Sequence, residues 1–443
     1  MSARKSPLMA MLPLFAAFFL APLALLAGKL TGRPEVFQPY GPQGMTLWTG
    51  LAGLALLASL VDAGLKRVRL ADTQQKSGGK PRLLPVLLLG LALCAGLALL
   101  VRHFAPLLGQ AQNLAPLLEE LRLPALALFA GLWVWQFGPV GRTTLARLGA
   151  GLGALMTLDF LLTAIMARGI VLGGGFLLGA PHTQGGGHDA LAFLLCVALC
   201  ATLDHSTPAP TAYPQAASAD APSSLCRWLI VAGLLASFSR PGLLAGGGLI
   251  LLLDRHPLRD RLALAISFAM VIWMSLALPL PHMTTGRDEL SLAWHLSATM
   301  EALGQTPNAP FLGLPLNEPL ALAITEELPG LEWDPESMGL AVHIFELPSS
   351  ALRRLAAWGA GGPIAVLAGV LLCALRGRSR LGFGLVVTTL VCGALTPALH
   401  IPATATALCL ALLAAANATP NASAPGADGT TAASNEPAAT GGA

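Results

Sequence analysis

The sequence predicts an all-α membrane protein, a bundle of about twelve transmembrane helices with one long loop outside the membrane. Of its 443 residues, 54% are hydrophobic and only 11% are charged, whereas a soluble domain carries about 25% charged residues. The hydrophobic residues also fall in runs long enough to cross the roughly 30 Å hydrocarbon layer as helices. A water-soluble fold would leave much of this apolar surface exposed, so we expect a polytopic membrane bundle.

The predicted spans follow one another in order along the chain. The first, at residues 8–27, could be taken for a signal peptide, but the many spans behind it favour a retained helix. Two short apolar segments at 228–253 are broken at 239–242, and such breaks occur where protein or a watery cavity satisfies the freed backbone groups. The other spans are expected at residues 45–65, 83–101, 123–140, 148–167, 189–203, 262–280, 363–375, 381–399 and 401–415.

The spans divide the chain into four parts. Residues 1–280 hold the first nine spans, 281–362 form a long polar loop with short helices, and 363–415 hold the last three spans. The loop carries ten acidic and three basic residues. Residues 416–443 are rich in Ala, Thr, Pro, Gly and Asn without periodicity, which predicts a disordered tail.

The lysine and arginine residues predict the orientation. If the N-terminus is cytoplasmic and the spans alternate, most of the 26 Lys and Arg residues fall on the cytoplasmic side, as the positive-inside rule requires. The C-terminal tail is then cytoplasmic too. The long loop falls on the outer side together with Arg168, Arg240 and Arg287.

Two of these outer arginines are candidates for binding an anion. Arg240 lies in the break between two short helices, where its forked donors suit a phosphate group. The alternative is an arginine that extends from a helix end toward water. Arg287 begins the long loop, and the neighbouring Asp288 and Glu289 offer it a simple ion pair instead.

The remaining candidates are a histidine, two acids and a third arginine. His343 lies near the end of the loop in an apolar context, where it is placed for proton transfer or serves only as a structural residue. Glu346 follows three residues later and would orient the ring if this segment is helical. Asp159 lies inside the fifth span and is either functional or paired within the bundle. Arg168 precedes the glycine-rich segment 173–175, which is a flexible loop or an anion cradle.

Several other functions lack their sequence signatures. There is no phosphate-binding loop, no Ser-His-Asp elbow and no zinc motif, and the basic residues are dispersed rather than gathered into a nucleic-acid footprint. Cys196 and Cys200 share a helix face but have no Cys or His partners, so we expect them to pack in the core. His182 and His188 are expected to be loop residues rather than metal ligands.

Three short motifs follow one another along the chain. They are residues 236–242 (ASFSRPG), then 285–287 (TGR) with Trp294 and 310–314 (PFLGL), and last His343 with 345–347 (FEL) and 359–362 (GAGG). In this order they resemble the Ser-Arg-Gly turn, the Gly-Arg…Trp…Pro-x-x-Gly run and the His-Asn-x-x-Leu…Gly run of the O-antigen ligase/polymerase superfamily. Ile344 departs from that family, which has asparagine after the histidine, and Pro241 stands where the family has glycine.

This resemblance implies an inverting, metal-independent glycosyltransferase in the bacterial inner membrane, with no cofactor. The donor would be a glycan on undecaprenyl diphosphate, moved whole to an acceptor hydroxyl on the periplasmic face. Arg240, Arg287 and more weakly Arg168 would bind the diphosphate, and His343 would be the base, with Glu346 and Asp159 as possible supporting residues. The expected acceptor is a lipid A-core sugar, as in an O-antigen ligase, and the alternatives are a growing glycan (a polymerase) or a protein (an oligosaccharyltransferase). Outside this class, a twelve-span transporter or lipid flippase stays open.

Overall fold

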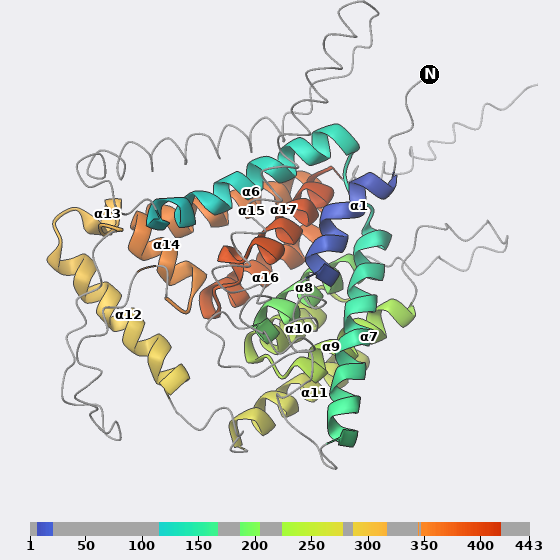
Figure 1. Ribbon diagram of the computed structural model, residues 1–443. Helices are drawn as coiled ribbons and strands as arrows, with labels where there is room; N and C mark the ends of the chain where they lie inside the picture. The colour runs from blue at the N-terminus through green and yellow to red at the C-terminus, as the bar shows by residue number, and fades with distance from the viewer. Residues whose placement is uncertain are drawn as a thin grey trace, which may run out of the picture.

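The computed structural model describes residues 7–20, 115–166, 187–203, 224–277, 287–316, 344 and 347–417. Every regular element within these residues is a helix (Figure 1), which confirms the all-α prediction for the described part of the chain. The predicted spans at 45–65 and 83–101 lie outside the described residues, as does the tail beyond residue 417.

From α6 onward, the helices that correspond to predicted spans begin and end within about four residues of the predicted positions, except that α6 and α7 begin earlier than predicted. The elements are α1 (Pro7–Phe15), η1 (Ala16–Leu20), α6 (Ala115–Phe137), α7 (Arg142–Met166), α8 (Gly187–Thr202), α9 (Ser224–Ser237), α10 (Arg240–Leu253), α11 (Leu258–Ala277), α12 (Arg287–Gln305), α13 (Ala309–Leu312), α14 (Ser350–Trp358), α15 (Gly361–Gly377), α16 (Arg380–Leu395), η5 (Ala398–His400) and α17 (Pro402–Ala416).

Serine residues set where three of the helices begin. Ser239, Ser349 and Ser379 precede α10, α14 and α16, and each hydroxyl accepts from a backbone N–H three residues later at 3.2 Å. These bonds satisfy donors that the first turn of a helix cannot pair internally. The helix starts are therefore encoded locally, in the residues just before each apolar run.

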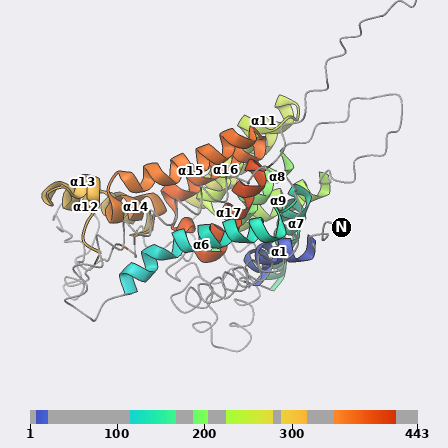
Figure 2. The same cartoon turned by 90° about the horizontal axis from the view of Figure 1, so that it is seen from above.

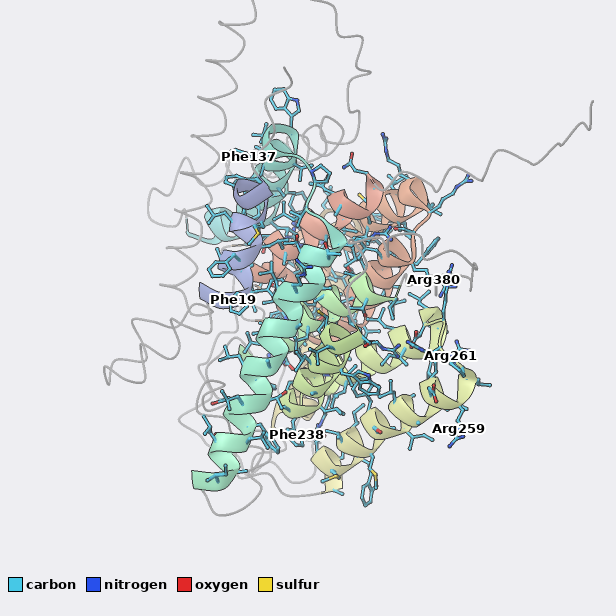
Figure 3. The ribbon with its side chains drawn as sticks, turned by 90° about the vertical axis from the view of Figure 1, so that its right-hand side faces the viewer. Phe19, Phe137, Phe238, Arg259, Arg261 and Arg380 are labelled. Atoms are coloured by element: carbon cyan, nitrogen blue, oxygen red, sulfur yellow. The ribbon has the colours of Figure 1, made fainter. Side chains whose placement is uncertain are left out.

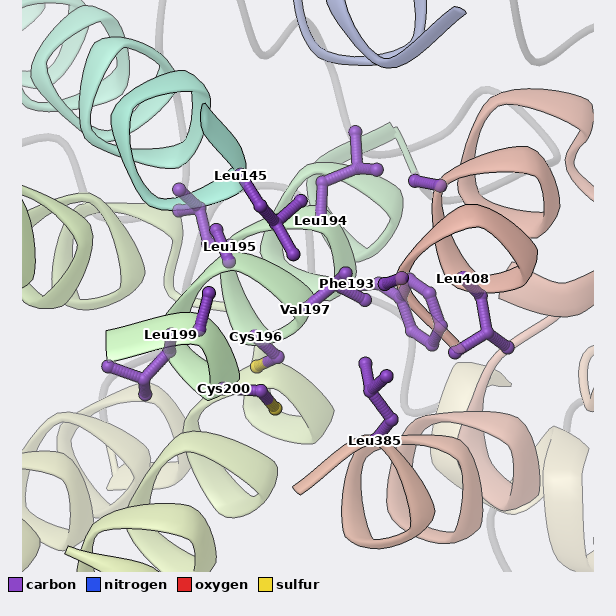
Figure 4. Packing of buried hydrophobic residues seen from close by; sticks show 14 of the residues in the cluster. Leu145, Phe193, Leu194, Leu195, Cys196, Val197, Leu199, Cys200, Leu385 and Leu408 are labelled. Atoms are coloured by element: carbon purple, nitrogen blue, oxygen red, sulfur yellow. The ribbon is translucent and has the colours of Figure 1, made fainter. Parts of the chain in front are cut away.

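Helix α8 lies at the centre of the bundle. All its residues from Ala190 to Thr202 are buried, as expected for a helix that is apolar on every face. It packs against α7, α9, α10, α16 and α17. Figure 4 shows Phe193 and Val197 of α8 facing Leu385 of α16 and Leu408 of α17.

One end of the bundle gathers arginines around the last turn of α10. The buried Arg227 pairs with Asp254, with its Nη1 3.4 Å from Oδ1. The Nη1 group of Arg261 donates to the Asp254 carbonyl at 3.3 Å, and Nη1 of Arg380 donates to the Leu253 carbonyl at 2.5 Å. Arg261 and Arg380 lie along one edge of the molecule in Figure 3. Positive charges stabilise this helix end because its carbonyls are unpaired.

The opposite end joins the start of α10 to the end of α16 and to α14. The Cys392 thiol lies 3.7 Å from the Pro241 carbonyl, and the Ser350 backbone N–H donates to the Thr396 carbonyl at 2.8 Å. Helices α10 and α16 therefore run antiparallel. Arg240, at the start of α10, lies at this end, and Asp254, just after α10, lies at the arginine-rich end.

Helices α12 to α14 lie together at one side of the molecule (Figure 2), and α14 also packs against α15 and α16. We call these three helices the lid. It has a small apolar core of its own, in which Leu303 of α12, Ala309 of α13 and Ala356 of α14 are buried together with Ile344. Ile344, the residue that departs from the family motif, therefore packs inside the lid.

The outer surface of the bundle is apolar over much of its area. One face of α11 is exposed along its full length, including Ile266 (64% exposed), Met270 (59%) and Trp273 (64%). By length and composition, two helices among the described residues could cross a membrane, Arg142–Ile165 and Leu258–Ala277. The other apolar helices span only 10–17 residues, so the count of twelve spans stays a prediction.

Candidate functional site

The break between α9 and α10 places Arg240 at the first turn of α10. Phe238 turns the chain in the left-handed region (φ 51°), which a non-glycine residue adopts at an energetic cost. Ser239 then caps α10, and Pro241 follows in the first turn, where its missing N–H costs nothing. A helix break is present, but it falls at residues 238–239 rather than at the predicted 239–242, because Arg240, Pro241 and Gly242 form the first turn of α10.

Gly242 lets α10 lie directly against α8. A Cβ on Gly242 would come within 2.5 Å of the Ala192 Cβ. This close approach brings the first turns of both helices together: the Ser239 hydroxyl donates to Asp189 Oδ1 at 2.5 Å, and His188 Nε2 lies 3.4 Å from the same oxygen. Two helix N-termini meet here, and the positive ends of their dipoles favour an anion.

Helix α11 holds the Arg240 side chain in place. The Arg240 Nε donates to the hydroxyl of Ser275 in α11 at 3.1 Å, and the Arg240 Nη2 donates to the Ser275 carbonyl at 2.8 Å. Ser275 is buried and Arg240 is partly exposed. Asp189 also attracts the guanidinium and offsets part of its charge. Arg240 is thus positioned by packed neighbours, unlike an arginine that extends freely from a helix end.

Asp159 of α7 is almost fully buried, at 3% exposed. The Thr163 hydroxyl donates to its backbone carbonyl at 2.7 Å. The next residue, Phe160, stacks on Phe238 with ring centroids 5.8 Å apart. Asp159 therefore lies on the part of α7 that packs against the α9–α10 break.

A buried ion cluster joins α6 to α14, and the sequence interpretation did not single it out. Arg353 Nε donates to Glu120 Oε1 at 2.7 Å, and Arg354 Nη1 lies 3.7 Å from Glu120 Oε2. The Trp358 indole N–H donates to the same Oε2 at 3.3 Å. This pairing lets α6 begin eight residues before the predicted span. The signal was available, because span alternation places Glu120 and both arginines on the same outer side.

The cluster controls the ionisation of its own members. Burial by itself raises the pKa of Glu120, but the charges of Arg353 and Arg354 outweigh it, so the carboxyl pKa lies below its ordinary value. The guanidinium pKa of Arg354 lies below its ordinary value, mainly because the group is buried. The charge of Glu120 raises this pKa, and the charge of Arg353 lowers it further. The carboxylate is therefore kept charged by the two arginines.

Two motifs that are far apart in the sequence meet in the lid. Gly313 (φ 82°) and Gly359 (φ 61°) both have a left-handed backbone that glycine adopts freely. A Cβ on Gly313 would lie 2.3 Å from the Ala357 carbonyl oxygen, and one on Gly359 would lie 2.5 Å from that of Pro310. The Ala360 N–H donates to the same Pro310 carbonyl at 2.8 Å. The glycines are therefore required for this contact.

The structure describes the predicted site residues unevenly. Arg240 and Asp159 are described with their side chains, and Arg287 is the first residue of α12, with no described side chain. Arg168, His343 and Glu346 lie outside the described residues. Cys196 and Cys200 are buried, and their thiols lie 3.3 Å from the Gly242 carbonyl and 3.6 Å from the Thr388 hydroxyl. No group of three or more potential metal-ligating side chains occurs within the described ranges.

A scan against protein-family models found no match to the chain, and a search of curated proteins found no significant match.

Proposed function

We propose that the chain is a membrane glycosyltransferase that moves a glycan from undecaprenyl diphosphate to an acceptor hydroxyl at the periplasmic face of the bacterial inner membrane. The fold is a bundle of about twelve spans with cytoplasmic termini. The fixed position of Arg240 at a helix break is the observation that supports this function most. The three ordered sequence motifs supply the reaction class.

The apolar exterior of the bundle supports the membrane location. The exposed face of α11 carries Ile266, Met270 and Trp273, and that of α15 carries Ile364 and Leu372. Contiguous apolar surface of this extent marks a contact with a membrane or with another protein. Lipid covers both faces in the proposed arrangement.

Arg240 binds the diphosphate of the donor in this proposal. The guanidinium lies beside the N-termini of α8 and α10, so its charge and two helix dipoles act on the same space. The donor's leaving group gains negative charge as the sugar–phosphate bond breaks. A fixed positive group that stabilises this charge lowers the barrier. Arg287 is the second diphosphate ligand, and Arg168 is a weaker third.

His343 is the base in the same scheme. It takes the proton from the acceptor hydroxyl, whose oxygen then bonds to the anomeric carbon from the face opposite the diphosphate. The carbon–oxygen bond to the diphosphate breaks, and the configuration at the carbon inverts. Ile344 anchors the neighbouring position in the lid core, and the packing of Gly359 and Ala360 on Pro310 links α13 to the residues just before α15.

The direct test is a transfer assay with purified protein, lipid-linked glycan and separate acceptors: lipid A-core, free glycan and protein. We expect transfer by the wild type, and a loss of at least about a hundredfold in Arg240→Lys, because a point charge does not replace a donor fork. His343→Ala is expected to lose transfer as well. Arg376→Lys, at the last turn of α15, is the matched control and should retain activity.

Three outcomes would contradict the proposal. Wild-type turnover in Arg240→Lys would remove the diphosphate ligand, and retained activity in His343→Ala would remove the base. Loss of transfer on adding a chelator would contradict a metal-independent reaction. Net movement of intact donor across a vesicle membrane, without transfer to any acceptor, would instead favour a flippase.

A further inference from the structure

A groove with apolar walls runs between α6, α15 and α17, with a volume of about 190 Å³. Leu123 of α6 and Leu408 of α17 are among its walls. Its floor is open because a Cβ on Gly361 or Gly369 would meet no atom within 4 Å. Helix α15 contributes Gly362, Val366 and Val370 and, beside them, a row of small residues at every fourth position: Gly361, Ala365, Gly369 and Cys373.

The length of the groove corresponds to one leaflet of a bilayer. At 1.5 Å per residue, the distance along α15 from Gly361 to Cys373 is about 18 Å. Half of the roughly 30 Å hydrocarbon layer is about 15 Å. The groove begins at the end of α15 that adjoins the lid and ends inside the helix. It therefore fits a single hydrocarbon chain whose headgroup lies beside α14.

An incompletely paired charge lies at the lid end of this groove. Arg354 lines the groove and is only 6% exposed. Its Nη1 is 3.7 Å from Glu120, but its Nε and Nη2 groups have no hydrogen-bond partner in the described part of the chain. A buried charged donor without a partner is costly. Both nitrogens are buried, so the guanidinium would turn toward the groove for a phosphate to accept from them.

We propose that this groove binds an anionic glycerophospholipid, with one acyl chain between α6, α15 and α17 and its phosphate on Arg354. This site rests on the membrane location proposed above but not on glycan transfer. A polyprenyl chain much longer than one leaflet would not fit the groove. The bound lipid fixes α15 against α6 and α17 and completes the charge pairing of Arg354.

Lipid retention by the full chain tests this site. The protein is purified in mild detergent, exposed to vesicles of phosphatidylcholine with a small fraction of phosphatidylglycerol, and examined by native mass spectrometry. We expect the wild type to retain one phosphatidylglycerol. Arg354→Gln should lose about tenfold of its preference for phosphatidylglycerol over phosphatidylcholine, because a charged hydrogen bond is removed.

A second variant keeps the test decisive if Arg354→Gln does not fold. Gly369→Leu fills the groove from a position with open space in front of it, and we expect it to retain no lipid there. Arg376→Gln and Gly304→Leu are the matched controls, both at exposed positions, and should behave as wild type. Equal retention of phosphatidylglycerol and phosphatidylcholine by the wild type would overturn the site. So would a Gly369→Leu variant that retains as much lipid as the wild type, or a wild type that captures polyprenyl phosphate instead. A failed transfer assay with phosphatidylglycerol still retained would count against the transferase alone.

Discussion

Each of the three buried arginines among the described residues lies beside a buried carboxylate. Arg227 faces Asp254, while Arg353 and Arg354 face Glu120. Arg240 differs because it is partly exposed, and its side chain donates hydrogen bonds to Ser275. Its partial exposure leaves the Arg240 guanidinium within reach of an anion from outside. A buried pair, in contrast, needs its partner at all times.

Replacing Glu120 tests the ion cluster. Glu120→Gln leaves two buried arginines without their shared carboxylate, so we expect a loss of about 3 kcal/mol or more in the free energy of unfolding. Thermal unfolding in detergent measures this loss. Glu301→Gln, at an exposed position of α12, is the control and should change stability little.

The same cluster predicts how stability depends on pH. The Glu120 pKa is lower in the folded protein than its ordinary value of 4.5. The stabilisation is therefore complete above about pH 4.5 and is lost as the pH falls toward the folded pKa. Glu120→Gln should remove this part of the acid dependence, and an unchanged acid profile in the variant would argue against the cluster.

At the scale of elements, the functional geometry depends on where helices stop. The α9–α10 break is built from Phe238, Ser239 and Pro241, which are local signals readable in the sequence. The junction of the lid is different. Gly313 and Gly359 were recognised only as parts of motifs. Gly313 packs on Ala357 and Gly359 packs on Pro310, which joins α13 to the end of α14 although the segments are far apart in the sequence. Sequence spacing does not reveal such a contact.

Substituting Gly313 tests the lid junction. Gly313→Ala places a Cβ 2.3 Å from a carbonyl oxygen at a positive φ, so we expect α13 to separate from α14. Hydrogen exchange of the α12–α14 amides should rise while that of α8 stays protected. Gly304→Ala is the control, since its Cβ meets no atom within 4 Å and alanine stabilises a helix by about 0.5–1 kcal/mol. Unchanged protection in Gly313→Ala would show that the contact between α13 and α14 does not require glycine at this position.

At the scale of the whole molecule, the two ends of the bundle differ in their chemistry. One end surrounds the last turn of α10 with Arg227, Arg261 and Arg380. The other carries Arg240, and α14 joins it through Ser350. The positive-inside rule assigns the first end to the cytoplasm in the proposed membrane arrangement.

Cysteine labelling in intact cells tests this orientation. Gly304→Cys in the lid and Arg259→Cys near the start of α11 both replace exposed residues. A membrane-impermeant maleimide should label the first from outside and the second only after the membrane is broken open, above the background of the unsubstituted protein. Labelling of both positions from the same side would contradict the alternation of spans.

The sequence by itself determined the all-α class, the approximate helix limits and the presence of a break close to Arg240. These depend on local quantities, namely the length of an apolar run, a serine cap and a proline in a first turn. Only the tertiary structure decided that Ser275 holds Arg240, that Glu120 pairs with Arg353 and Arg354, and that Gly313 lies against Ala357. Each of these contacts joins residues on different helices. Apolar periodicity shows which residues are buried but not which helices become neighbours.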